Sequence, residues 1–206
     1  MPESPPAASP QPLEGVVVAD FSRVLAGPYA TMLLADLGAE VIKVESPAGD
    51  DTRSWVPPVR PDGVSTYYTS INRNKSSVVL DFKDDADLAT ARALARRADV
   101  MIENFKPGGL ARFGLDYRTV RQANPSLVYC SISGFGTQAG AALPGYDLIV
   151  QAMSGLMSLT GDPDGTPYRA GISVFDVMAG LHSAVAILAA LRHRDATGEG
   201  PPLETN

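Results

Sequence analysis

One aspartate lies where its carboxylate could act either as a nucleophile or as a helix cap. Asp176 precedes a run in which large apolar side chains recur at helical steps, namely Val177, Met178, Leu181, Val185, Leu188 and Leu191. The Arg-His-Arg sequence at 192–194 and Gly198 mark the end of this helix. A carboxylate at a helix N-terminus faces unpaired N–H groups and the positive end of the helix dipole. On these residues alone, a helix cap is the simpler interpretation and a reactive carboxylate is the alternative.

A second group of candidate residues lies at the C-terminal end of the strand-like run 99–105. It consists of Asn104, Phe105 and Lys106, which are followed by one proline and two glycines. Ligands of open parallel sheets collect outside the carboxyl ends of the strands. The sequence therefore predicts a binding site at this end of the strand.

Two irregular stretches give weaker signals. Residues 47–65 are rich in Pro, Gly and Asp, and their Arg53 and Trp55 could serve a site. Packing within the loop is the simpler interpretation of both side chains. Residues 72–75, Asn-Arg-Asn-Lys, form a turn whose cations suit a phosphate, although solvated turns of this kind are common.

These candidates lie on alternating strands and helices. The β-branched run 16–21, the helical stretch after it and the strand 40–46 form a βαβ unit, which implies a parallel sheet with a right-handed crossover. Three more strands and one helix are expected at 76–82, 99–105, 126–136 and 84–98. The first turn lacks the G-x-G-x-x-G pattern, so NAD binding is disfavoured. The order predicts an α/β fold with a Rossmann-like, doubly wound, mainly parallel sheet.

Composition excludes several classes of function. The chain has 206 residues, of which 45% are hydrophobic and 19% charged, and its net charge is −6. This charge argues against general nucleic-acid binding, which needs a broad basic face. The single cysteine, Cys130, lies in a strand-like run and is expected to be a buried structural thiol. The cysteine and two histidines have no metal-ligand spacing, so we expect no metal.

The cellular location is predicted from the start of the chain and from hydropathy. The first twelve residues, MPESPPAASPQP, have neither a basic region nor an apolar run, and we expect no secretory signal there. No stretch is expected to cross a membrane, since the run 177–191 is amphipathic and ends in Arg-His-Arg. These observations favour a cytoplasmic protein without a membrane partner.

Several blocks of sequence occur in the order that is found in one enzyme family. They are RVLAGPYATMLLADLGAEVIKVE, GDDTRSW, INRNKSS, IENFKPGGLARFGL, NPSLVYCSISGFG, GYDLIVQAMSGLMSLTG and the D-V-M-A-G segment. Over residues 13–200 the chain resembles the N-terminal half of the class III CoA-transferases, a family that includes formyl-CoA transferase, carnitine CoA-transferases and α-methylacyl-CoA racemase. It is most similar to the succinate–hydroxymethylglutarate type. The Pro, Ser and Ala content of the first residues predicts a disordered tail at 1–14, and the resemblance implies a CoA-binding α/β large domain at 15–200.

The resemblance also implies a reaction. Members of the family move CoA between two carboxylic acids through a catalytic aspartate, and the matching residue is Asp176. The substrates would be an acyl-CoA and a small carboxylic acid, with an aspartyl-CoA thioester as the intermediate. With the family in view, a nucleophile becomes the preferred interpretation of Asp176, and we expect its carboxylate to stay ionised at the helix N-terminus.

The resemblance further implies positions that contact CoA. They lie at or after the C-terminal ends of three predicted strands and are Leu25, Ala26, Leu80, Lys83, Asn104, Phe105, Lys106 and Arg112. Lys83, Lys106 and Arg112 carry the charge that suits the CoA phosphates. Ser46 stands where some members have a basic residue, so one phosphate contact of those members is not expected here.

A racemase is the first alternative to a transferase. In the racemases a histidine precedes the aspartate that begins the helix near 147, and this chain has Tyr146 there. Without that histidine one of the two bases for α-proton exchange is missing, which favours transfer. His182 lies inside the next predicted helix and is expected to be a surface or packing residue.

The second alternative concerns the C-terminal end of the sequence. Family members are about twice as long, form interlocked homodimers and carry a small domain that we expect to be absent here. Residues 201–206 depart from the family pattern because Pro201 and Pro202 follow TGEG. A non-catalytic CoA-binding module therefore stays open as a second function, and a homodimer is expected for the complete enzyme.

Overall fold

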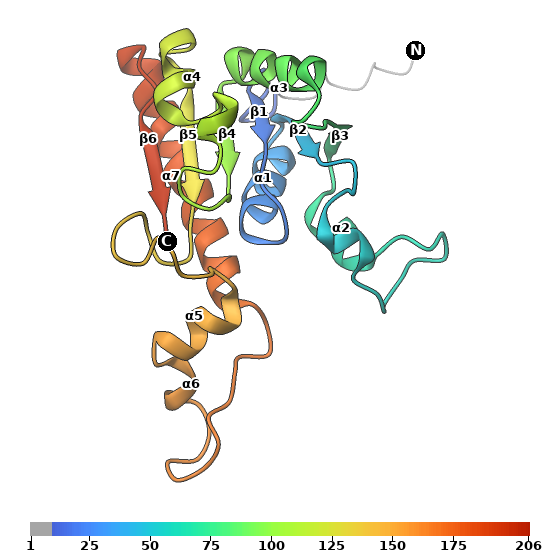
Figure 1. Cartoon of the computed structure of the whole chain (residues 1–206), viewed down its shortest axis with the longest axis vertical. Helices are drawn as coiled ribbons and strands as arrows, with labels where there is room; N and C mark the ends of the chain where they lie inside the picture. The colour runs from blue at the N-terminus through green and yellow to red at the C-terminus, as the bar shows by residue number, and fades with distance from the viewer. Residues whose placement is uncertain (1–9) are drawn as a thin grey trace, which may run out of the picture.

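The computed structural model describes residues 10–206, which contain a six-stranded, entirely parallel sheet (Figure 1). The strands are β1 (Val17–Asp20), β2 (Glu40–Glu45), β3 (Lys75–Val79), β4 (Val100–Glu103), β5 (Val128–Ile132) and β6 (Pro202–Thr205). Their order across the sheet is β3-β2-β1-β4-β5-β6. The strand order reverses between β1 and β4, and ligands of doubly wound sheets bind at this switch point. The predicted α/β, doubly wound architecture is confirmed.

Helices cover both faces of the sheet. The covering helices are α1 (Ala26–Asp36) and α7 (Val174–Thr197) on one face, and α3 (Asp85–Arg97) and α4 (Tyr117–Ala123) on the other. Side chains of one strand alternate between the two layers, as in β4, where Val100 and Ile102 face α1 and α7 while Met101 faces α3.

Three short helices lie beyond the carboxyl ends of the strands, where Figure 1 shows them below the arrowheads. They are α2 (Thr66–Ile71), α5 (Asp147–Met153) and α6 (Leu156–Leu159). Two 3₁₀ turns, η1 (Asp51–Ser54) and η2 (Ala111–Phe113), complete the connections. The carboxyl end of the sheet therefore carries three of the short helices.

The predicted elements occur within a few residues of their expected bounds, with one strand added. β6 (Pro202–Thr205) pairs with β5, whereas the sequence analysis set 201–206 apart and assigned no strand there. Cys130 is buried in β5 as expected, and its burial raises the pKa of the thiol to about 11.

The long helix α7 buries a face that the sequence analysis did not predict. Its buried residues are mostly small and include Gly180, Ser183, Ala184 and Ala190, while Met178, Leu181, Val185 and Leu188 are exposed. Small side chains let α7 lie close against α1. By length and composition α7 would also suffice to cross a membrane, contrary to the sequence expectation. In this fold it packs on α1, β5 and β6.

Both ends of α7 are fixed to the rest of the fold. At its C-terminal end, Arg194 donates to the Asp99 carboxylate at 2.7 Å, and Asp99 also accepts the N–H of Val17 at 2.8 Å. This ion pair ties α7 to the amino ends of β1 and β4. At its N-terminal end, the carboxylate of Asp147 accepts two main-chain N–H groups.

The contact between α7 and α1 predicts the effect of enlarging Gly180. A Cβ atom there would lie 2.6 Å from the Ala26 carbonyl oxygen and 3.0 Å from the Tyr29 ring. Alanine favours an isolated helix by about 1 kcal/mol, but overpacking costs about 1–3 kcal/mol. We expect Gly180→Ala to lower the free energy of unfolding by up to about 2 kcal/mol in urea titrations. Gly171→Ala is the matched control because its Cβ would meet open space, and an equal loss there would contradict this account.

Candidate active site

Asp176 lies in the first turn of α7 but does not cap it. The N-cap residue is Ser173, so Asp176 occupies the third helical position. The cap comes from elsewhere in the chain, since one Asp147 oxygen accepts the N–H of Phe175 at 2.7 Å and that of Asp176 at 3.2 Å. The cap interpretation of Asp176 is therefore wrong, and its carboxylate is not used for capping.

The Asp147 carboxylate is held in place by its neighbour on α5. Gln151, one turn along α5, donates to the second Asp147 oxygen, and its own carbonyl accepts the N–H of Ala170 at 2.8 Å. Both side chains are buried. These contacts join α5 and the segment before α7 to the N-terminus of α7. Sequence reasoning missed both residues, although an acid and an amide four positions apart at a helix start were a usable signal.

The carboxylate of Asp176 has an unusual electrostatic environment. Within residues 10–206 it accepts no hydrogen bond and forms no ion pair, and it is partly buried. Burial, followed by the negative charge of Asp147, raises the pKa of Asp176 to about 6. We expected an ionised carboxylate stabilised by the helix N-terminus. The charge is instead destabilised, yet the group remains mostly ionised at neutral pH, as a carboxylate nucleophile requires.

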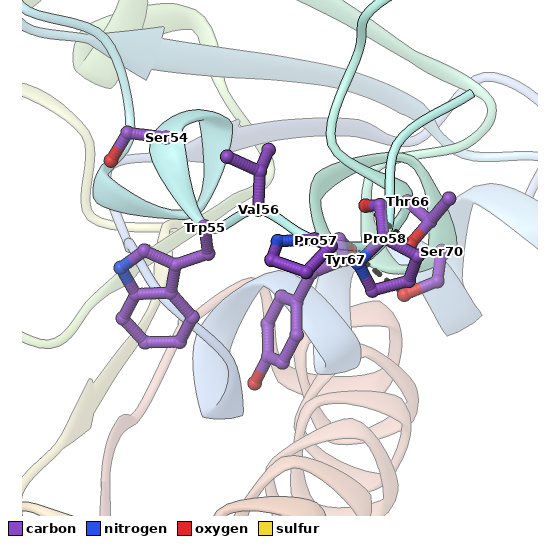
Figure 2. Close-up of a pocket in the computed structure, with 8 residues that line it drawn as sticks. All are labelled: Ser54, Trp55, Val56, Pro57, Pro58, Thr66, Tyr67 and Ser70. Carbon is purple, nitrogen blue, oxygen red and sulfur yellow. Dashed lines mark hydrogen bonds between the residues drawn. The ribbon is translucent and has the colours of Figure 1, made fainter. Parts of the chain in front are cut away.

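A hollow of about 820 Å³ opens between the loop after β2 and α2. Figure 2 shows its lining residues, Ser54, Trp55, Val56, Pro57, Pro58, Thr66, Tyr67 and Ser70. The rings of Trp55 and Tyr67 meet edge to face with their centroids 5.1 Å apart. Trp55 is 43% exposed, so it lines this hollow and does not plug the loop as the sequence analysis preferred.

The hollow and Asp176 are electrostatically coupled through Tyr67. Burial, and after it the charges of Asp176 and Asp147, raise the pKa of the Tyr67 hydroxyl to about 12. Tyr67 therefore stays protonated and lies within electrostatic reach of Asp176. Neither Tyr67 nor the hollow was predicted from the sequence, because the residues that line it come from one segment of an irregular loop and from a short helix after that loop.

Arg53 and the turn 72–75 have structural roles, since their cationic side chains bond to carboxylates of the protein itself. Arg53 makes a two-pronged ion pair with Glu45, with both N···O distances at 2.7 Å. Arg73 and Asn74 both donate to Asp36 on α1, and the buried Lys75 ammonium bonds to the carboxylate of Asp20. The phosphate site that this turn suggested is therefore not supported.

Asn104 connects the two strands that flank the switch point. Its side-chain carbonyl accepts the N–H of Arg23 at 3.0 Å, and its amide donates to the Arg23 carbonyl at 2.7 Å. The loops after β1 and β4 are thus joined. Leu25 and Ala26 directly follow this loop at the start of α1, and Gly180 of α7 contacts Ala26. The predicted residues Leu25, Ala26 and Asn104 are therefore brought together, next to the helix that carries Asp176.

The remaining predicted CoA contacts lie near the carboxyl ends of β3 and β4, on the α3 and α4 side. Leu80 is buried in that core layer and Phe105 packs against it, so both side chains are structural. Phe82 and Phe113 meet with ring centroids 5.2 Å apart, which joins the segment of Lys83 to that of Arg112. Lys83, Lys106 and Arg112 are exposed, and this arrangement fits a phosphorylated ligand at the edge of the switch point.

Comparisons with known proteins show the family of the chain. Residues 13–206 match the sequence model of CoA-transferase family III. The chain is 52% identical to the succinate–glutarate CoA-transferase of Agrobacterium fabrum over 94% of this chain and 50% of that protein. It is 47% identical to the human succinyl-CoA:glutarate CoA-transferase, with 95% of this chain and 45% of that protein covered.

Solved structures give the same result. The crystal structure of a CAIB/BAIF family protein from Brucella suis superposes with a TM-score of 0.91 at 46% identity, covering 95% of this chain and 53% of that one. The chain spans about half the length of the relatives that it matches. On the family match, these identities and the shared fold, the chain belongs to CoA-transferase family III.

Proposed function

We propose that this chain supplies the CoA-binding region and the nucleophile of an acyl-CoA:carboxylate CoA-transferase. The observation that carries the proposal is the unpaired, partly buried Asp176 carboxylate, which lies one helical turn from the glycine that contacts the β1–α1 turn. A structural carboxylate at such a position would be paired. A nucleophile must instead have a free oxygen directed at its substrate.

The proposed reaction conserves charge and needs no proton transfer. The Asp176 carboxylate attacks the thioester carbonyl, the C–S bond breaks, and an anhydride and CoA thiolate form. The thiolate attacks the Asp176 carbonyl carbon, which releases the first acid as a carboxylate and leaves aspartyl-CoA. The second acid attacks this thioester, expels the thiolate and forms a new anhydride. The thiolate then attacks the acyl carbonyl of that anhydride, which yields the new acyl-CoA and restores the Asp176 carboxylate.

The charge environment of Asp176 favours its acylation. In the resting protein the ionised carboxylate is opposed by burial and by the charge of Asp147. Formation of an anhydride or thioester removes the negative charge from Asp176. The unfavourable interaction is therefore present before the reaction and absent in the covalent intermediates, which lowers the energy needed to reach them.

Residues near Asp176 support transfer over racemisation. Tyr146, at the position where racemases have histidine, is 68% exposed, and its phenol stands in place of the imidazole base that α-proton exchange would need there. His182 lies on the exposed side of α7 and contacts the Met178 carbonyl of its own helix, as the sequence analysis expected. In the described part of the chain, no histidine lies in the candidate site.

The substrate class follows from the relatives and from the hollow beside Asp176. Two relatives are named for transfer between succinate and glutarate, and we propose that this protein likewise uses small dicarboxylic acids. The hollow offers aromatic and proline surfaces from Trp55, Tyr67 and Pro57, together with the protonated Tyr67 hydroxyl. Aliphatic chains suit the apolar surfaces, and a carboxylate suits the hydroxyl donor.

A homodimer and a cytoplasmic location belong to the same proposal. The exposed apolar side chains of α7 support a dimer, since soluble proteins seldom expose a continuous apolar stripe. The single buried cysteine supports a reducing compartment. Sedimentation of the purified protein tests the dimer directly.

Calorimetric titration with CoA tests the binding half of the proposal. We expect saturable binding that weakens about tenfold with dephospho-CoA, because a lost phosphate contact is worth about 1.4 kcal/mol. Lys106→Ala should weaken binding of CoA more than binding of dephospho-CoA if Lys106 contacts the 3′-phosphate. Arg97→Ala is the matched control, since Arg97 is exposed at the C-terminal end of α3, which precedes the amino end of β4. A folded protein that binds no CoA would contradict the site.

A further inference from the structure

Val24 has a backbone conformation that its side chain disfavours. Its φ of 68° lies in the left-handed region, and within the described residues only Val24 and Asn74 have positive φ among non-glycines. Asparagine tolerates this region, but a β-branched residue there is under steric strain. Val24 lies in the turn between β1 and α1, directly before Leu25 and Ala26. Such strain persists only where the surrounding structure fixes it.

A buried ion pair bonds to this turn at Val24 and at a residue before it. The Asp50 carboxylate accepts the N–H of Val24 at 3.3 Å and lies 2.9 Å from the Lys43 ammonium. The same ammonium donates to the Ser22 carbonyl at 2.9 Å. Lys43 is 1% exposed and Asp50 is 4% exposed. One salt bridge therefore fixes the carbonyl two positions before Val24 and the N–H of Val24 itself.

The Asp50 carboxylate is itself held in a fixed orientation. Its other oxygen accepts the N–H and the hydroxyl of Thr52 at 2.9 and 2.7 Å. The N–H of Asp50 donates to Glu45 at 2.8 Å, and Glu45 is paired with Arg53. The loop after β2 thus acts as a rigid support for the loop after β1.

A second buried pair supports the rest of the same turn. The Lys75 ammonium lies 3.1 Å from the Asp20 carboxylate and donates to the Pro28 carbonyl at 2.9 Å. Asp20 also accepts the N–H of Ser22 at 3.0 Å. Four buried charges therefore surround one short turn. Buried ion pairs are weak contributors to stability compared with apolar packing. Their presence here therefore favours a role in fixing the backbone of the turn.

We propose that the Lys43–Asp50 ion pair is a positioning device that holds Val24 in its left-handed conformation and thereby presents Leu25 and Ala26 to CoA. This inference rests on the proposed function, which places CoA at this turn. Without the pair, Val24 relaxes toward negative φ and rotates the residues that follow it. α1 begins at Ala26 with no side-chain cap, so its start depends on the turn. Lys43 and Asp50 are positioning residues, since they act through the backbone of the turn.

Replacing Val24 with glycine removes the backbone strain, and it therefore shows whether the Lys43–Asp50 pair positions the turn or stabilises the fold in general. Asp50→Asn keeps an acceptor for the Val24 N–H but removes the charge that holds Lys43, and we expect CoA to bind about 10- to 100-fold more weakly. Val24→Gly alone should bind like the wild type because glycine adopts this conformation freely. In the double variant D50N/V24G we expect affinity within about threefold of V24G.

Asp99→Asn is the matched control for loss of a carboxylate that accepts a main-chain N–H and pairs with a cation. Asp99 does so at the opposite end of the sheet, so D99N should lower the melting temperature without changing CoA affinity. Calorimetry with CoA and thermal melts are recorded for all variants. If D50N alone fails to fold, restored folding and binding in D50N/V24G support the inference.

The possible outcomes separate the two proposals. A wild type that folds but binds no CoA overturns the proposed function and this inference with it. A wild type that binds CoA, together with a D50N variant that binds equally well, overturns the positioning role alone. A D50N defect that V24G does not rescue also overturns it, because the pair would then act on the fold as a whole.

Discussion

Replacing Asp176 with alanine is expected to reduce CoA transfer in the full-length protein by at least about 10⁴-fold, the scale of loss when a covalent nucleophile is removed. The expected measurement is the rate of CoA transfer from succinyl-CoA to glutarate, followed by chromatography of the two thioesters. CoA binding should remain within a few-fold of the wild type, because the predicted phosphate contacts lie on other elements. The loss would therefore appear in kcat and not in the affinity for CoA.

The covalent intermediate gives an independent readout of the same residue. Wild-type protein mixed with acyl-CoA and no acceptor acid should carry CoA on the peptide that contains Asp176, detected by mass spectrometry. Asp164→Ala is the matched control, since Asp164 is an exposed aspartate in the loop before α7. An Asp176→Ala variant that retains transfer activity, or a CoA adduct on another residue, would falsify the nucleophile assignment.

The same residue should lower the stability of the fold. Asp176 has a folded-state pKa of about 6 against an ordinary value of 3.8. Between these values the folded state binds more protons than the unfolded state, so stability falls as the pH rises from about 4 to about 6. Above pH 6 the full penalty is present and amounts to at most about 3 kcal/mol. Asp176→Asn removes the ionisation, so we expect it to be more stable than the wild type at pH 7.5.

The pH dependence distinguishes this effect from ordinary changes in packing. The stability difference between Asp176→Asn and wild type should shrink as the pH falls from 6 to 4, and urea titrations at several pH values measure it. Asp164→Asn serves as the control, since an exposed aspartate should give little difference at either pH. A difference for Asp176→Asn that is independent of pH would contradict the raised pKa.

Much of the fold could be predicted because it depends on local patterns. The strands that become β1, β2 and β4 are short apolar runs bounded by turns, and their alternation with helices dictates a parallel sheet. The position of Asn104 at the switch point followed from the same reasoning, since it ends a strand. β6 was missed because it begins at Pro202, directly after Pro201, and two consecutive prolines suggested the end of regular structure.

The missed features depend on contacts between distant segments. Periodicity identified α7 but not its buried face, because Gly180 and Ser183 pack closely on α1 while Leu181 and Val185 remain exposed. The raised pKa of Asp176 could not be predicted, since it depends first on burial in the folded chain and then on Asp147, which lies 29 positions earlier. The role of Trp55 likewise depends on Tyr67, which is reached only after an irregular loop.

The attachment of α7 at both ends restricts how the chain can change by insertion and deletion. Asp147 holds the start of the helix and Asp99 holds Arg194 near its end, at opposite ends of the strands. One residue inserted into α7 between Asp176 and Arg194 would turn Asp176 by about 100° about the helix axis relative to Arg194 and shift it by about 1.5 Å. No loop inside the helix could absorb that change. Insertions should therefore be tolerated in the turns that flank α7 and selected against within the helix. The length of α7 thus determines the direction in which the Asp176 carboxylate points.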